Sequence, residues 1–253
     1  MRLSADGIPD QSFGVNGLAT LLPNDDVDIN DIAIAPDGKI VAAGSVVTGN
    51  GLAMLIARLN PADGTLDASF NGSGTKEVEF PLGDKNYAWA ESVVVAADGS
   101  IIAAGGAAYM TAHVNTIFKT TPAGNVATTF GPGHDGKVVT QMGTESVTRK
   151  ILLQCDGRIL LVGHTMQNGS LRYDMAARRL DRFGNVDQDF GVNGVAIVPF
   201  DLDGPQNDVA GDAFLQGGQL VITGYAGSGS GNQAVDAFSF ARLTSDTIFC
   251  DGF

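Results

Sequence analysis

The sequence repeats itself about every 60 residues, and this internal period is the feature that most limits the folds open to the chain. The first anchor is a phenylalanine preceded by Ser, Thr or Asp, at Phe13, Phe70, Phe130 and Phe190, with a glycine four residues later, or six residues later in the third unit. The second is a turn-forming pair followed by apolar residues and a glycine, at Asp37-Gly38, Asp98-Gly99, Asp156-Gly157 and Gly217-Gly218. The third is a basic residue after an apolar run, at Arg58, Lys119, Arg179 and Arg242, with Arg2 left from a preceding unit. Three anchors in one register indicate four copies of a single structural unit.

Each unit is predicted to contain four strands, named a to d in chain order. Strand a is expected at residues 18–22, 75–80, 137–141 and 195–200, and strand b at 31–35, 92–96, 149–154 and 211–215. Strand c is expected at 39–43, 100–104, 158–162 and 219–223, and strand d at 52–57, 114–118, 174–177 and 237–241. The Asp-Gly pairs predict b-c hairpins with type I′ turns, which need positive φ at both turn residues. Strand c is almost continuously apolar, which predicts cover on both faces.

The predicted fold is an all-β, single-domain β-propeller with four four-stranded repeat units. The units span approximately residues 2–57, 58–118, 119–178 and 179–241, and a tail follows at 242–253. The 34 glycines suit short strands and tight turns better than long helices. Four units form either a closed four-bladed ring or part of a larger propeller. If the ring is not closed, its end units expose apolar faces, and a homodimer is one way to cover them.

Two segments carry a family resemblance. Residues 58–70 (RLNPADGTLDASF) and 34–44 (IAPDGKIVAAG) resemble the delta-60 repeat, a bacterial propeller-type repeat. The pattern departs from the family at Ala123-Gly124, Phe183-Gly184 and Gly217-Gly218. The resemblance implies an extracellular or cell-envelope location and implies no particular reaction. The chain as given has no apolar signal-peptide core in residues 1–10.

Charge argues against nucleic acid as a partner. The chain has 28 acidic against 15 basic residues and a formal charge of −13, which repels phosphate backbones. The uncharged run at 100–118 has membrane length, but its glycines and polar residues argue against a transmembrane segment. The two cysteines, Cys155 and Cys250, could form one disulfide at the end of the fold that carries the b-c turns, or remain free thiols.

An up-and-down strand order separates the connections into two ends. The b-c turns and d-a linkers repeat from unit to unit, so we name their side the repeated end. The a-b and c-d loops differ between units and define the variable end. Aromatic residues fall in or beside the variable-end loops, at Tyr87, Trp89, Tyr109, Tyr173 and Tyr225. An acidic group is expected there too, at Asp25, Asp26, Asp28, Asp84, Asp201, Asp203 and Asp208.

The candidate ligand-binding residues are Tyr87, Trp89, Asp84, Tyr109, Tyr173, Tyr225 and His164. Aromatic rings as stacking platforms and carboxylates as acceptors predict an extracytoplasmic binding or scaffold module for a carbohydrate or a protein partner. The competing interpretation is that loops collect polar and amphipathic residues without binding anything. The alternative function is a propeller-fold hydrolase or lyase that uses carboxylates and His164 on the same face. No nucleophile elbow or zinc-type histidine pair accompanies these residues, so no catalytic residue is assigned.

No cofactor or metal is expected. The loop at residues 24–31 is rich in Asp but lacks the glycine and terminal glutamate of an EF-hand loop. The paired Asp6 with Asp10 and Asp63 with Asp67 do not recur in every unit, so a calcium site in each unit is not favoured. Each Asp-Gly pair is expected to be a turn in which the Asp side chain bonds its own backbone.

Overall fold

The protein is built from four sets of antiparallel strands. The computed structural model describes residues 1–22, 24–82, 86–109, 112–167, 172–200, 202, 207–228 and 235–243. Module 1 contains β1 (Val27–Ile34), β2 (Ile40–Thr48), β3 (Gly51–Leu59) and β4 (Thr75–Val78); module 2 contains β5 (Asn86–Val95), β6 (Ile101–Tyr109), β7 (Ala112–Thr120) and β8 (Lys137–Thr140). Module 3 contains β9 (Glu145–Leu153), β10 (Ile159–Met166), β11 (Tyr173–Leu180) and β12 (Val195–Val198); module 4 contains β13 (Asp208–Gln216), β14 (Gln219–Ser228) and β15 (Val235–Leu243). The prediction of an all-β chain is confirmed for the described residues.

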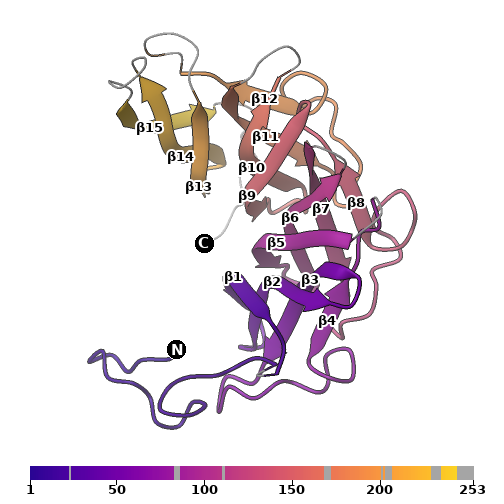
Figure 1. The fold of residues 1–253 in the computed structure, drawn as a ribbon, viewed down its shortest axis with the longest axis vertical. Helices are drawn as coiled ribbons and strands as arrows, with labels where there is room; N and C mark the ends of the chain where they lie inside the picture. The colour runs from indigo at the N-terminus through magenta and orange to yellow at the C-terminus, as the bar shows by residue number, and fades with distance from the viewer. Residues whose placement is uncertain are drawn as a thin grey trace.

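The modules follow one another along an arc (Figure 1). The first strand of each module, β1, β5, β9 and β13, lies on the inner side of the arc, and the later strands lie progressively farther out. A short parallel pairing of Gly51 and Leu52 with Asn86 and Tyr87 joins modules 1 and 2 into one eight-stranded sheet. The arc is open between modules 1 and 4 (Figure 1), and this arrangement is propeller-like without a closed sheet.

The strand order within the modules corrects the prediction by one strand. Strand a, expected to open each unit, pairs with the last strand of the preceding unit: β4 pairs with β3, β8 with β7 and β12 with β11. Each complete sheet therefore has the order b-c-d-a. The strand expected at 18–22 does not form; only Leu18 makes an isolated bridge, to Val15. Its equivalents each pair with the d strand before them, and no described strand precedes residue 18.

The b-c hairpins form as predicted, but three of the four turns differ from the predicted type. Positive φ occurs at Gly38, Gly99 and Gly157, and not at the aspartates before them. The backbone N–H of Ala35 bonds the carbonyl of Lys39 at 2.8 Å, so the turn has three residues with glycine in the left-handed position. Only module 4 has a two-residue turn with positive φ at both Gly217 and Gly218.

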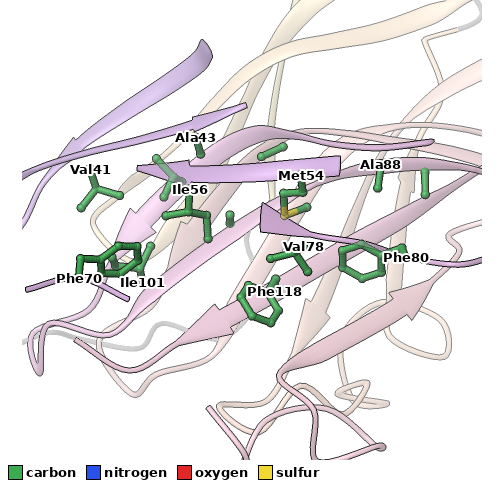
Figure 2. Packing of buried hydrophobic residues seen from close by; sticks show 14 of the residues in the cluster. Val41, Ala43, Met54, Ile56, Phe70, Val78, Phe80, Ala88, Ile101 and Phe118 are labelled. Carbon is green, nitrogen blue, oxygen red and sulfur yellow. The ribbon is translucent and has the colours of Figure 1, made fainter. Parts of the chain in front are cut away.

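The core lies between neighbouring modules, which pack face to face. Figure 2 shows the cluster between modules 1 and 2, where Met54 and Ile56 of β3 meet Ile101 of β6 and Phe118 of β7. A second cluster joins modules 2 and 3, and a third joins modules 3 and 4. Neighbouring modules cover both faces of β6 and β10, as their apolar sequences predicted, whereas module 2 covers one face of β2. Among the described residues, none belongs to a helix long and apolar enough to cross a membrane.

Candidate functional site

The side chains that repeat at the repeated end hold the modules together. Arg58 at the end of β3 binds Asp67 (Nε to Oδ2, 2.9 Å) and Ser69 (3.0 Å), and its guanidinium lies over the Phe70 ring. Arg2 and Arg179 bind Asp10 and Asp187 in the same way, at 2.9 and 2.8 Å, over Phe13 and Phe190. These residues are therefore engaged in structural contacts.

The linkers also bind one another. The N–H of Gly14 donates to Asp63, that of Asn71 to Ala123 and that of Gly131 to Phe183, at 2.7 to 2.8 Å. Arg2 and Arg58 each donate to a proline carbonyl of the following linker, Pro61 and Pro122. The side chains of Asp37, Asp98 and Asp156 accept the backbone N–H two residues on, as expected for Asp-Gly turns. The repeated end is thus occupied by module-to-module contacts, and the variable end is left as the place for a site.

The first strand of every module contains a β-bulge near the variable end. The pairing skips one residue at the same position in β1, β5, β9 and β13, namely Asn30, Glu91, Arg149 and Gly211. A bulge bends the strand and re-aims the extra side chain. Here it directs Glu91 and Arg149 toward each other across two modules, with Arg149 Nη1 and Glu91 Oε1 3.0 Å apart.

Glu91 and Asp31 link the inner strands through polar contacts. Glu91 Oε1 also accepts the indole N–H of Trp89 at 2.9 Å. Asp31 Oδ2 accepts the Ser92 hydroxyl at 2.7 Å and the backbone N–H of Val93 at 3.0 Å, and lies 3.5 Å from the Lys150 ammonium. Polar side chains of three modules therefore meet on the inner side of the arc.

Rings and a carboxylate continue from Trp89 toward module 3. The Trp89 and His113 rings meet edge to face, with centroids 5.7 Å apart. His113 Nδ1 lies 2.9 Å from Glu145 Oε1, and the Tyr173 hydroxyl interacts with the Glu145 carboxylate, which raises the pKa of Tyr173. Tyr173 meets the buried His164 edge to face at 5.1 Å. We call the whole set the central cluster: Trp89, Glu91, His113, Glu145, Arg149, His164 and Tyr173.

The surroundings set the charges in the central cluster. Burial, helped by nearby Arg149, lowers the pKa of His164 to about 4, so its imidazole is neutral at pH 7. Burial acts against ionisation of Glu145, but hydrogen bonds from His113 and Tyr173 outweigh it and lower the pKa of Glu145. Burial and the Glu145 carboxylate raise the pKa of Tyr173. The cluster thus offers an ionised carboxylate beside a neutral phenol and a neutral imidazole.

The structure brings together three of the residues proposed from sequence and separates others. Trp89, Tyr173 and His164 belong to the central cluster. Tyr87 and Trp89 lie within β5, not in a loop, because the b strands are longer than predicted. Tyr87 is half exposed and makes none of the contacts described for the central cluster. Tyr225 lies on β14 of module 4 and pairs with Phe238.

Other candidates fall outside the described residues or are buried. Asp84 is outside them, as are Asp201 and Asp203, and Tyr109 ends β6 with its side chain undescribed. Asp208, predicted as part of the acidic group at the variable end, is buried and accepts the backbone N–H of Phe200 at 2.7 Å. Cys155 is disulfide-bonded, and its predicted partner Cys250 is outside the described residues.

Sequence reasoning missed Glu91, Arg149 and Glu145. The signal for the first two was present: Ala90-Glu91-Ser92 and Thr148-Arg149-Lys150 each break the alternation expected of a half-buried strand. Glu145 gave no such signal because it begins a strand that was predicted to start four residues later. Within the described part of the chain, no three His, Cys, Asp or Glu side chains are grouped as metal ligands.

The family comparison agrees with the propeller-like arrangement. The family described as a domain of unknown function (DUF5122) beta-propeller matches residues 35–70, from the first b-c hairpin to Phe70. Among solved structures, polysaccharide lyase Uly1 is similar with a TM-score of 0.46 and 12% identity over 85% of this chain; the match spans 45% of that chain, less than half its length. A comparison with curated proteins found no match. The chain is therefore an all-β protein that contains a β-propeller-type repeat.

Proposed function

We propose that the chain is a binding module that holds a carbohydrate at the central cluster, on four modules that act as propeller blades. One observation carries the proposal: Trp89, His113, Glu145 and Tyr173 form an unbroken series of contacts at the variable end. The repeat would be of delta-60 type and the location extracytoplasmic, as the sequence resemblance implies.

The chemistry of the cluster suits a polyhydroxylated ligand. Sugar rings stack their C–H faces on aromatic rings, and their hydroxyls donate to carboxylates. Trp89 and His113 provide ring surface, and the His113 side chain is 45% exposed. Glu145 is an ionised acceptor held in place by two neighbours. The second carboxylate, Glu91, is fixed by Trp89 and Arg149.

The test uses the single tryptophan of the chain. Trp89 fluorescence is followed while calcium and a panel of neutral, anionic and cationic soluble polysaccharides are titrated. We expect a saturable change with at least one polysaccharide. Replacing His113→Ala or Glu145→Gln should weaken that binding at least about tenfold, because each removes a direct contact. The matched control is Asp189→Asn, an exposed carboxylate at the repeated end, which should leave affinity unchanged.

Three results would change the proposal. No saturable response to any polysaccharide would contradict it. Equal loss of affinity in Asp189→Asn would move the site to the repeated end. Binding of a basic protein, weakened by salt, would indicate that the exposed carboxylates Asp25, Asp26 and Asp28 recruit a protein partner instead.

Catalysis is the second candidate, favoured by the pairing of His164 with Tyr173. A neutral imidazole can accept a proton, and the phenol beside it can donate one. A lyase or hydrolase of this kind would release new reducing ends from a polysaccharide, and Tyr173→Phe would abolish that release while leaving ligand binding within about threefold. Absence of product over long incubation with every polysaccharide that binds would remove this candidate.

A further inference from the structure

Module 1 exposes an apolar face that the other modules bury. Strand pairing places Ile32 of β1 opposite Ala42, and the equivalent positions hold Val93, Ile151 and Ala213. Ile32 is 63% exposed, whereas those three are at most 3% exposed. Ile34 is 64% exposed for the same reason. A groove of about 560 Å³ runs over this leading face, which we define by its lining residues Ala19, Leu21, Ile29, Ile32, Ile34 and Ile40.

Module 4 exposes the other face of its sheet, which in modules 1 to 3 packs on the following module. Phe240 pairs with Thr223, and the equivalent positions hold Ile56, Ile117 and Ala177, all fully buried. Phe240 is 59% exposed and Phe238 is 75% exposed. Phe214 is nearly half exposed on the same sheet. We call this set, Phe214, Phe238 and Phe240, the trailing face.

The molecule already shows how these two kinds of face fit. At each internal junction, the trailing-type face of one module packs on the leading-type face of the next. Met54 and Ile56 pack with Ile101 in this way (Figure 2), and Val93 belongs to the same cluster. The same arrangement recurs between modules 2 and 3 and between modules 3 and 4. The face that fits the groove on module 1 is therefore of the type that module 4 exposes.

Modules 1 and 4 also each border a chain segment that lacks a strand partner among the described residues. In the described residues, module 4 has b, c and d strands, and β15 has no partner on its outer side. The segment at 18–22 follows a linker that is held by the Arg2–Asp10 ion pair, but within the described residues it pairs with no d strand. The register of β3 with β4 places Thr20 opposite Ser239 and Ala19 opposite Phe240.

We propose that two copies of this chain associate into one ring, with the trailing face of each copy seated on the leading face of the other. Segment 18–22 of one copy adds to β15 of its partner as the fourth strand of module 4. A two-fold arrangement satisfies both pairs of faces at once, and two sets of four blades lie within the range of about four to eight blades found in propellers. The inference rests on the blade assignment and is independent of the ligand.

Charge predicts how this association depends on salt. Each copy carries a formal charge of −13, so two copies repel each other at low ionic strength. The contacting faces are apolar and do not weaken as salt screens that repulsion. Dimerisation should therefore tighten as ionic strength rises, whereas association through ion pairs would weaken.

A pair of cysteines tests the register and the source of the partner. The double variant Thr20→Cys/Ser239→Cys is oxidised mildly, run on a non-reducing gel and mapped for a link between residues 20 and 239. We expect a covalent species of twice the 26.1 kDa chain mass. The control Ala19→Cys/Ser239→Cys should not crosslink, because adjacent positions point to opposite faces of the sheet. A 20–239 link within one chain would show closure on itself and overturn the proposal, as would no link.

Equilibrium sedimentation of the native chain gives a second, independent test. We expect a dimer whose dissociation constant rises at least about tenfold in Phe240→Asp and in Ile32→Asp, since each places a charge in an apolar contact. Both side chains are exposed in the single chain, so these variants should still fold. The control is Phe183→Asp, an exposed aromatic residue at the repeated end, away from both faces. A monomer at all salt concentrations would overturn the proposal, and a monomer that still binds polysaccharide would leave the proposed function standing.

Discussion

The buried imidazole of His164 should make the stability of the fold depend on pH in a defined window. The unfolded chain takes up a proton at His164 with a pKa near 6.5, whereas burial lowers the folded-state pKa to about 4. Between these values the unfolded state binds more protons, so the free energy of unfolding falls as pH decreases. The full difference is about 3 kcal/mol, and about 2.5 kcal/mol of it is reached by pH 4.5.

The perturbation is His164→Leu, which removes the titrating group and fills the same buried place. Among the described residues, Nδ1 of His164 has no hydrogen-bond partner, so the substitution leaves no described polar group newly unpaired there. The assay is urea unfolding of both proteins at pH 7.5 and pH 4.5. Because the carboxylates are common to both proteins, their titration largely cancels in the comparison.

We expect the native protein to lose about 2.5 kcal/mol more than His164→Leu between the two pH values. An equal loss in both proteins would show that His164 titrates as freely in the folded state as in the unfolded state. The lowered pKa attributed to burial of His164 beside Arg149 would then be refuted. A larger loss in His164→Leu would refute it as well.

Three further substitutions probe the close packing of strands and the Arg–Asp ion pairs of the linkers. Gly106→Ala places a Cβ 2.8 Å from the Trp89 ring and should shift Trp89 emission and weaken ligand binding, whereas Gly49→Ala, with open space around it, should change neither. Gly163→Ala places a Cβ 1.8 Å from the Val147 carbonyl oxygen and should cost about 3 kcal/mol in urea unfolding; an unchanged midpoint would contradict the close strand approach. Asp67→Asn should lower the free energy of unfolding by about 1–2 kcal/mol at pH 7, because it weakens the contact with Arg58. Burial acts to raise the pKa of Asp67, but the contacts with Ser69, Lys39 and Arg58 outweigh it and lower that pKa to about 2. The difference in stability should therefore shrink as pH falls from 3.8 toward 2.

The repeat and its hairpins could be predicted because their signals are local. Each Asp-Gly pair lies between apolar runs, and a short hairpin needs no distant partner to be recognised. The turn type was harder: Asp37-Gly38 fits a two-residue turn by composition, but pairing of Ala35 with Lys39 makes it a three-residue turn. Only Gly217 and Gly218 follow the simpler rule, because both can adopt positive φ without strain.

The assignment of strand a could not come from local pattern. Residues 75–78 are close in sequence to β5, yet they pair with β3, from which a linker separates them. The Arg58 to Asp67 ion pair folds the linker back on its own module, and this contact was not recognised from sequence. Residues 18–22 share the pattern but have no described partner strand before them, so the same sequence signal gives no strand.

The central cluster could be predicted in part. The aromatic residues at the variable end drew attention to Trp89, Tyr173 and His164. Glu91 and Arg149 depend on a β-bulge, which adds one residue to a strand and changes where the side chains point. Tyr225 carries the same aromatic signal but lies in module 4, where it pairs with Phe238 of the trailing face instead of joining the central cluster.

Hydrogen–deuterium exchange along the whole chain, with and without the polysaccharide that gives the largest Trp89 response, would show directly whether the central cluster binds carbohydrate. We expect protection at the variable-end strand segments that carry the cluster, residues 86–91, 112–116, 145–149 and 173–176, with unchanged exchange in the linkers at 60–73 and 181–193. Protection confined to those linkers, or no protection under saturating polysaccharide, would contradict it.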